Sequence, residues 1–263
     1  MFLRVLVENT SLSPALHAEH GLSLYLEADG KRILFDCGQT DAFAKNAELL
    51  SVDLGAVDLC ILSHGHYDHG GGISAFLSQN SHAPVYIHRD AFDRHFSSPE
   101  KEIGIDPSLK NHPQIMLTGD ETVLSPHLHL LTLNEEKMLY PLSNENMLRM
   151  ENGRLTEDRF FHEQYLLIEE AGKRILISGC SHKGALNLMH RLQPDVLIGG
   201  FHWKKRATDG ESGLSLLREA DMLAQFPARF YTCHCTGEQV YAFIEPRFSG
   251  RIGYLSCGCE LTL

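Results

Sequence analysis

With 263 residues, the chain is long enough to bury the core of one large globular domain. It carries 23 Lys and Arg against 34 Asp and Glu, a formal net charge of −11, and basic residues are nowhere interleaved with aromatics, so we expect no nucleic-acid partner. Seven cysteines, an odd number, argue against a secreted disulfide scaffold and favour free thiols or metal contacts.

The first residues, 1–8, become charged too early for a secretory signal, and no apolar run approaches the length of a membrane span. We therefore expect a cytoplasmic protein that makes no membrane contact and acts on a small molecule. The sequence carries no signal for an oligomeric state.

The first third of the chain predicts strands that alternate with helices. A strand over 2–8 is followed by a hairpin whose strands, 22–28 and 31–36, are joined by the turn Asp29-Gly30. The next elements are a helix over 40–50, a strand over 57–62, a helix over 72–79 and a strand over 85–88.

Regular patterning weakens between 89 and 160, where Pro, Asn, Ser and His are scattered and one strand, 128–133, is expected. We interpret this region as a lid or insertion that carries substrate specificity. Regular alternation then resumes. It predicts strands over 164–169, 174–177, 196–198, 230–233 and 252–255, and helices over 183–191, over 212–225 and from 238.

One segment is repeated inside the chain. Residues 27–38, EADGKRILFDCG, closely match residues 169–180, EEAGKRILISGC, and both predict a hairpin that leads to a polar loop. Two such halves would pack sheet on sheet with helices outside, in one α/β domain that spans 1–263. The polar strand ends would then meet in one cleft.

The segment SHGHYDHGGG, 63–72, places three histidines and an aspartate within six positions directly after a buried strand. His64 and His66, two residues apart on an extended tail, point to the same side and can bind one cation through their imidazoles. Asp68 and His69 face a second position. This donor set suits Zn, Mn or Fe, and the neighbouring glycines let the backbone approach closely.

The pattern His64-x-His66-x-Asp68-His69 after a strand resembles the signature of the metallo-β-lactamase superfamily. The loops at 36–38, 178–182 and 232–237 look like further motifs of that family. The resemblance implies a four-layer αββα sandwich with two divalent metal ions, zinc above all, between its sheets. The sequences GCSH at 179–182, GGFH at 199–202 and HCTG at 234–237 are similar to the narrower subgroup of dihydropterin-methyl-ribofuranosylaminobenzene-phosphate synthase.

The resemblance also implies a distribution of ligands. His64 and His66 would bind one ion, and Asp68, His69 and His234 the other, with His182 completing the site from the second half. Many superfamily members have a bridging aspartate where this chain offers Gly179-Cys180. The Cys180 thiolate could bridge, but we favour His182, because neutral imidazole is the commoner ligand.

Five other residues are candidates for the site. His162 lies where other family members have their third histidine, and a packed histidine is an equally good interpretation. Asp36 is expected to orient a ligand imidazole through a hydrogen bond. His202, Tyr67 and Lys204 are candidates for substrate contacts, with the basic residues 204–206 meeting a phosphate.

Two close cations lower the pKa of a shared water, so the first hypothesis is a hydrolase that uses a metal-bound hydroxide on a phosphate, thioester or lactone substrate, with Asp68 as proton acceptor. The first alternative is a transferase of the synthase type, in which the same cations neutralise a departing pyrophosphate. The second is a metal-binding sensor without turnover.

Overall fold

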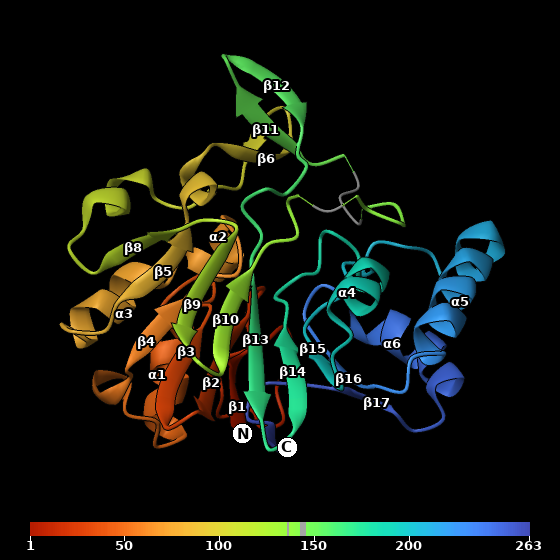
Figure 1. The fold of residues 1–263 in the computed structure, drawn as a ribbon, viewed down its shortest axis with the longest axis horizontal. Helices are drawn as coiled ribbons and strands as arrows, with labels where there is room; N and C mark the ends of the chain where they lie inside the picture. The colour runs from red at the N-terminus through yellow and green to blue at the C-terminus, as the bar shows by residue number, and fades with distance from the viewer. Residues whose placement is uncertain (136, 143–145) are drawn as a thin grey trace.

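Two seven-stranded sheets pack face to face and carry helices on their outer faces (Figure 1). The computed structural model describes residues 1–135, 137–142 and 146–263. The mixed α/β sandwich predicted from the sequence is confirmed. No helix among these residues is long and apolar enough to cross a membrane.

The first sheet has the strand order β18-β1-β2-β3-β4-β5-β8. Its antiparallel part is formed by β18, β1, β2 and β3, and its parallel part by β3, β4, β5 and β8. The strands are β1 (Phe2–Val7), β2 (Ser23–Ala28), β3 (Lys31–Phe35), β4 (Leu59–Ile61), β5 (Val85–His88), β8 (Ile115–Thr118) and β18 (Glu260–Thr262). The helices of this half are α1 (Ala42–Leu49), α2 (Tyr67–Gly70) and α3 (Ile73–Gln79).

The second sheet, β9-β10-β13-β14-β15-β16-β17, repeats this order of antiparallel and parallel pairs. Its strands are β9 (Glu121–Ser125), β10 (Leu128–Leu131), β13 (Tyr165–Glu170), β14 (Lys173–Ile177), β15 (Val196–Ile198), β16 (Arg229–Thr232) and β17 (Ile252–Tyr254), and its helices are α4 (Ala185–Leu192), α5 (Gly210–Ala224) and α6 (Glu238–Ile244). The hairpins β2-β3 and β13-β14, which carry the internal repeat, therefore occupy equivalent places.

Both faces of the central strands are buried. In β14, Ile175 and Ile177 face the core between the sheets, whereas Leu176 packs under the helices of the second half. In β2, Leu24 faces the core between the sheets and Tyr25 faces the side of α1. This alternation follows from the two-residue period of a strand, and it explains why these strands are apolar at almost every position.

The region 89–160, expected to be a lid or insertion, is divided in the structure. Strands β8, β9 and β10 belong to the two main sheets. A third sheet, β12-β11-β6-β7, is built from β6 (His95–Ser98), β7 (Lys101–Glu102), β11 (Leu148–Glu151) and β12 (Arg154–Glu157), and lies at the end of the sandwich opposite the termini (Figure 1). Only these outer stretches stand apart from the sandwich.

The strand expected at 252–255 is observed as β17, but it is not the last strand, because β18 follows it and pairs with β1. With three residues, ELT, β18 is too short to show an alternating pattern. Four 3₁₀ helices complete the described elements: η1 (Leu54–Ala56), η2 (Arg89–Phe92), η3 (Pro107–Asn111) and η4 (Glu245–Phe248).

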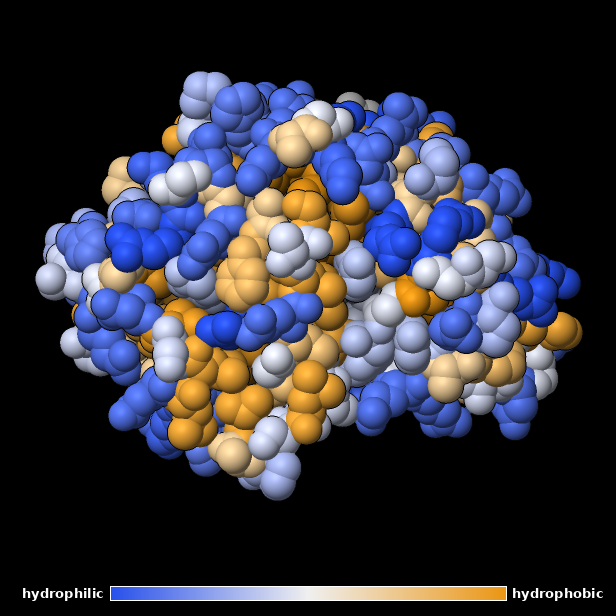
Figure 2. Space-filling view, turned by 90° about the horizontal axis from the view of Figure 1, so that it is seen from below, coloured by the Kyte–Doolittle hydropathy of each residue, from blue (hydrophilic) through white to orange (hydrophobic). Residues whose placement is uncertain are grey.

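The end of the sandwich that carries both termini faces the viewer in Figure 2. Apolar residues gather towards the middle of this face, and hydrophilic residues surround them. Leu261 and Leu263, at the C-terminus, pack partly buried against the core between the sheets. This end is therefore closed by apolar packing, and the polar strand ends lie at the other.

Shortening a side chain between the sheets is expected to destabilise the whole sandwich. Leu166 on β13 is fully buried in this core, so Leu166→Ala should lower the free energy of unfolding by about 2–5 kcal/mol. The control, Leu214→Ala on α5, removes a side chain that is 57% exposed and should change it by less than about 0.5 kcal/mol. Urea unfolding followed by circular dichroism measures both. Equal effects would contradict the assignment of this core.

Candidate metal centre

Loops that follow parallel strands of both sheets converge at one end of the sandwich. Asp36 follows β3, His64 follows β4, Cys180 comes shortly after β14, and His202 and His234 follow β15 and β16. Because the two sheets face each other, the carboxyl ends of their parallel strands open onto the same space, as in other α/β folds. Residues almost two hundred positions apart thus become neighbours.

One cluster of donors is formed by His64, His66 and His182, all at most 4% exposed. The Nε2 atom of His64 lies 3.0 Å from the Nδ1 atom of His66. Ligand atoms of the three residues lie within 4.8 Å of one another. The His182 ring also stacks on Phe160, with ring centroids 3.9 Å apart, which fixes its orientation.

A second cluster surrounds the carboxylate of Asp68. Its Oδ2 atom lies 3.3 Å from Nε2 of His234 and 3.9 Å from Nε2 of His69. Cys180 approaches from the second half, with its Sγ atom 3.2 Å from Nε2 of His69. His20, which the sequence analysis did not single out, places Nε2 3.2 Å from Asp68 Oδ2 and stacks on His234.

These spacings fit metal binding. Two ligands of a tetrahedral zinc ion, each about 2.0–2.1 Å from the metal, lie about 3.3 Å apart. The separations in both clusters, 3.0–3.9 Å, fall around that value. The donors are imidazole, carboxylate and thiol, the groups that bind divalent transition metals.

Hydrogen bonds at the far side of three rings also fit this role. Nδ1 of His64 lies 2.9 Å from Ser63 Oγ, Nδ1 of His69 lies 2.6 Å from Asp36 Oδ2, and Nδ1 of His234 lies 2.9 Å from Asn9 Oδ1. When each Nδ1–H donates to its partner, the lone pair of each Nε2 is directed to the donor clusters.

The protonation states of the site follow from burial and from its carboxylates. Burial and neighbouring imidazoles lower the pKa of His64 well below its usual value, so the ring is neutral. Burial raises the pKa of Asp68, but His69 and His234 outweigh it and hold that pKa well below its usual value. Burial lowers the pKa of His69, but Asp36 and Asp68 outweigh it and raise that pKa to about 9. At neutral pH the His69 ring therefore also carries a proton on Nε2, and an ion would have to displace this proton before that nitrogen could bind it.

Asp36 joins the first hairpin to the histidine loop. Its Oδ1 atom accepts from the backbone N–H of Ser63, and its Oδ2 atom accepts from Ser63 Oγ and His69 Nδ1. The residue has a φ of +61° and is fully buried. A carboxylate here fixes both the start of the loop and the ring of His69.

Two further buried carboxylates hold the ligand loops of the second half, and sequence reasoning missed both. Glu163 accepts from the backbone N–H groups of His182 and Lys183 and from the Tyr165 hydroxyl. Glu8 accepts from the backbone N–H of His234. Glu8 lies just after β1 and Glu163 just before β13, and the sequence assigned no role to either residue, so only their contacts reveal it.

His162 contacts the histidine loop without directing a free nitrogen into either cluster. Its Nδ1 atom accepts from the backbone N–H of Gly65, and its Nε2 atom lies 3.3 Å from Asp158 Oδ2. Asp158 also contacts Nδ1 of His95 on β6, at 2.8 Å. This arrangement favours the interpretation of His162 as a packed histidine that links the third sheet to the loop.

A cavity of about 220 Å³ opens beside the two clusters. Its lining includes Asp68, His182 and His234, and also His202 and Tyr67. Lys101, Lys204 and Lys205 also line this metal-side cavity, so positive charge gathers there on a protein of net charge −11. The three substrate-contact candidates of the sequence analysis therefore all border the same space.

The chain is similar in sequence to known proteins. Residues 18–133 match the family model of the metallo-beta-lactamase superfamily. The chain is 29% identical to 7,8-dihydropterin-6-methyl-4-(beta-D-ribofuranosyl)-aminobenzene-5'-phosphate synthase of Methanocaldococcus jannaschii, over 84% of this chain and 82% of the synthase. It is 28% identical to an uncharacterized protein of that archaeon, over 89% and 90% of the two chains.

A solved structure described as a metal-dependent hydrolase of the beta-lactamase superfamily is similar to the whole chain. The two superpose with a TM-score of 0.85 at 26% identity, over 100% of this chain and 99% of the other. The arrangement of both sheets is thus shared with that structure.

Replacing Asp36 by asparagine tests whether this carboxylate supports metal binding. Asp36→Asn keeps an oxygen for the Ser63 N–H but weakens the acceptor for His69, so metal affinity should fall about 10–100-fold. Chelator competition measures the affinity. Asp58→Asn, a change of the same kind at a half-exposed residue that accepts from Arg32, should leave it unchanged. Equal affinities of both variants would contradict the role of Asp36.

Proposed function

We propose that this chain is a metal-dependent hydrolase of small anionic substrates, on the premise that its residues 18–133 match the metallo-beta-lactamase superfamily. The observation that carries the proposal is the position of the Asp68 carboxylate. It lies among the imidazoles of both halves and also lines the metal-side cavity. A substrate in this cavity would thus meet metal ligands and a proton acceptor at the same place.

The proposed cofactor is a pair of divalent ions, zinc first and manganese or iron as alternatives. His64, His66 and His182 would hold one ion. Asp68, His69 and His234 would hold the other, with Cys180 beside His69. Buried imidazoles with a thiol nearby favour zinc over magnesium or calcium. When bound, such a pair would lower the pKa of water to near neutrality and polarise the bond to be cleaved.

Asp68 is proposed as the proton acceptor of the reaction. Its carboxylate is ionised at neutral pH and lies 3.2 Å from Nε2 of His20. Burial and the nearby His234 lower the pKa of His20 to about 4, so this ring is neutral at pH 7. Since the His20 side chain is half-exposed, it connects Asp68 to solvent, and a proton taken up by Asp68 can leave by this route.

The substrate is proposed to be anionic because lysines gather where it would enter. Lys101, Lys204 and Lys205 come from two distant parts of the chain and line one cavity. In a protein with a surplus of eleven negative charges, such a cluster attracts an anion and orients it above the donor clusters.

A transferase is the second candidate, and the similarity to the M. jannaschii synthase favours it. The same lysines would neutralise the negative charge that develops on a departing diphosphate. Water need not be the nucleophile in that reaction, so the two candidates differ in the second substrate. A metal-binding sensor is the third, and it would share the ligands but turn over neither type of substrate.

Replacing His66 tests the hydrolase. Metal-loaded protein should hydrolyse at least one member of a panel of phosphodiesters, thioesters and lactones, and His66→Ala should lower kcat/KM by at least about 100-fold because an ion is lost. His129→Ala, on β10 in the second sheet, is the matched control and should retain full activity. Release of pyrophosphate from a pterin-methyl diphosphate in the presence of an aryl phosphate acceptor, without hydrolysis of the panel, would favour the transferase. Bound metal without either reaction would favour the sensor.

Two variants distinguish Cys180 from His182 as the residue that completes the site. His182→Ala leaves His64 and His66 alone, so one of two bound ions should be lost. Cys180→Ser leaves Asp68, His69 and His234 in place, so both ions should remain, with lower affinity for one. Metal analysis by inductively coupled plasma spectrometry measures the stoichiometry, with Cys259→Ser as control. Loss of an ion in Cys180→Ser alone would reverse the assignment.

A further inference from the structure

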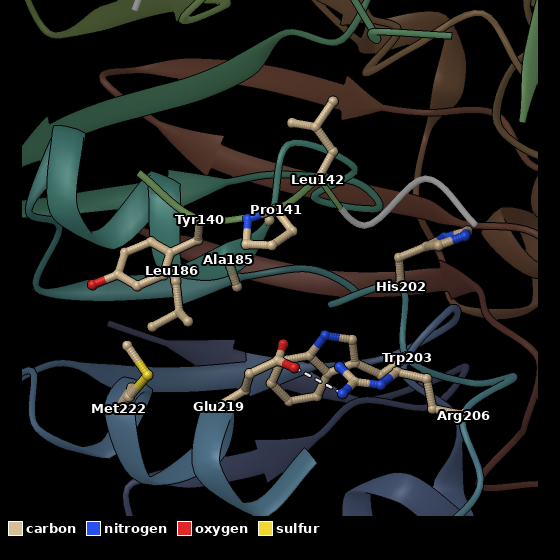
Figure 3. A pocket seen from close by; sticks show the side chains of 11 residues that line it. Tyr140, Pro141, Leu142, Ala185, Leu186, His202, Trp203, Arg206, Glu219 and Met222 are labelled. Atoms are coloured by element: carbon tan, nitrogen blue, oxygen red, sulfur yellow. Dashed lines mark ion pairs between the residues drawn. The ribbon is translucent and has the colours of Figure 1, made fainter. Parts of the chain in front are cut away.

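A second cavity, of about 300 Å³, shares His202 with the metal-side cavity. We name it the Trp203 cavity, and Figure 3 shows the side chains that line it. Its walls are mainly apolar. Tyr140 and Leu142 come from the segment 137–142, Leu186 from α4, Trp203 from the loop after β15, and Met222 from α5. In Figure 3 Tyr140, Leu186 and Met222 lie at one end of the cavity and His202 lies at the other.

We propose that the Trp203 cavity binds a planar ring of the substrate, while the anionic group of the same molecule lies over the metal centre. The anionic end rests on the proposed function, but the ring site rests on the cavity alone. The ligand is therefore an aryl or heteroaryl compound that carries a phosphate or another small anion.

His202 connects the two spaces, because it lines both cavities. Its ring lies 4.2 Å from that of His182, between centroids, and in Figure 3 it points away from the other side chains of the Trp203 cavity. The Nδ1 atom of His202 is buried and has no hydrogen-bond partner within the described parts of the chain. A polar atom of a ligand that spans both cavities would supply that partner.

The volume of the Trp203 cavity and its lining side chains limit the size and polarity of the ring that can bind there. A volume of about 300 Å³ corresponds to about ten water molecules, enough for one or two fused rings but not for a polymer. Pockets of this kind bind apolar ligand parts, with a few polar groups that fix the orientation. Here the polar groups are Arg206 and Glu219, which form an ion pair at 2.7 Å, and the Arg206 guanidinium lies over the Trp203 ring.

Hydrogen bonds within the protein hold the outer wall of the cavity in place. Asn187, a buried residue of α4, accepts from the backbone N–H groups of Leu139 and Tyr140 through its Oδ1 atom. It also donates to the carbonyl oxygen of Tyr140, and the Tyr140 hydroxyl contacts Nε2 of His190 at 2.9 Å. Because the wall is preorganised, binding a ring there costs little ordering.

The test uses tryptophan fluorescence, because Trp203 is the single tryptophan of the chain. The probes are 2-naphthyl phosphate, which carries the ring, and methyl phosphate, which does not. Titration of the metal-free and the zinc-loaded protein with 2-naphthyl phosphate should quench the Trp203 emission and saturate in both states. Methyl phosphate should leave the emission of the metal-free protein unchanged.

A matched pair of variants places the ring. Met222→Tyr enlarges a half-buried side chain of the cavity and should weaken 2-naphthyl phosphate binding by about tenfold or more, measured by calorimetry. It should change methyl phosphate binding to the zinc-loaded protein by less than about twofold. Met116→Tyr, on the exposed face of β8, should leave both affinities unchanged.

The outcomes separate this inference from the proposed function. Equal affinities of the Met222→Tyr and unmodified proteins for 2-naphthyl phosphate, or no response of Trp203, would overturn the ring site even if the protein proved to be a hydrolase. Saturable, Met222-dependent binding to the metal-free protein would sustain the ring site even if no hydrolysis were found.

Discussion

Three buried carboxylates, each of which accepts three or four hydrogen bonds, hold the polar end of an otherwise apolar sandwich together. Asp36 binds the start of the histidine loop, Glu163 binds the backbone at 182–183, and Glu8 binds the backbone of His234. A buried carboxylate is costly unless protein donors replace its lost water, and here backbone N–H groups do so. The loops that carry the donor atoms are therefore fixed by the protein itself, and their imidazoles are oriented without help from an ion.

The two halves have the same arrangement of strands, but they contribute different side chains to the candidate metal centre. Equivalent hairpins end in Asp36-Cys37-Gly38 in the first half and in Ser178-Gly179-Cys180 in the second. In this repeat Asp36, which orients His69, corresponds to Ser178, and Cys180, whose thiol lies 3.2 Å from the same ring, corresponds to Gly38. Pseudo-symmetric packing brings the strand ends together, and substitution at equivalent positions then makes the site asymmetric.

The third sheet and the two cavities border the candidate metal centre. His95 of the third sheet and His162 share the carboxylate of Asp158, and His162 in turn accepts from the backbone of the histidine loop. The position of this sheet is thereby tied to the loop that carries most donors. Lysines on one side and an apolar cavity on the other give the centre two chemically different neighbours, joined at His202.

The sequence alone determined most of the regular elements of the sandwich and the position of a candidate metal-binding loop. Strands such as β5 and β15 were predicted with their observed bounds, because short apolar runs with β-branched residues favour strands over other elements. The spacing of His64, His66, Asp68 and His69 predicted that their side chains could bind metal. The tertiary structure decided what depends on distant contacts. The short strand β18 and the third sheet arise from pairings that no local pattern encodes, and the roles of Glu8, Asn9 and Glu163 appear only once distant loops meet. An acidic or amide residue looks the same in the sequence whether it is exposed to solvent or buried in a site. Only its contacts in the folded protein show which of these roles it has.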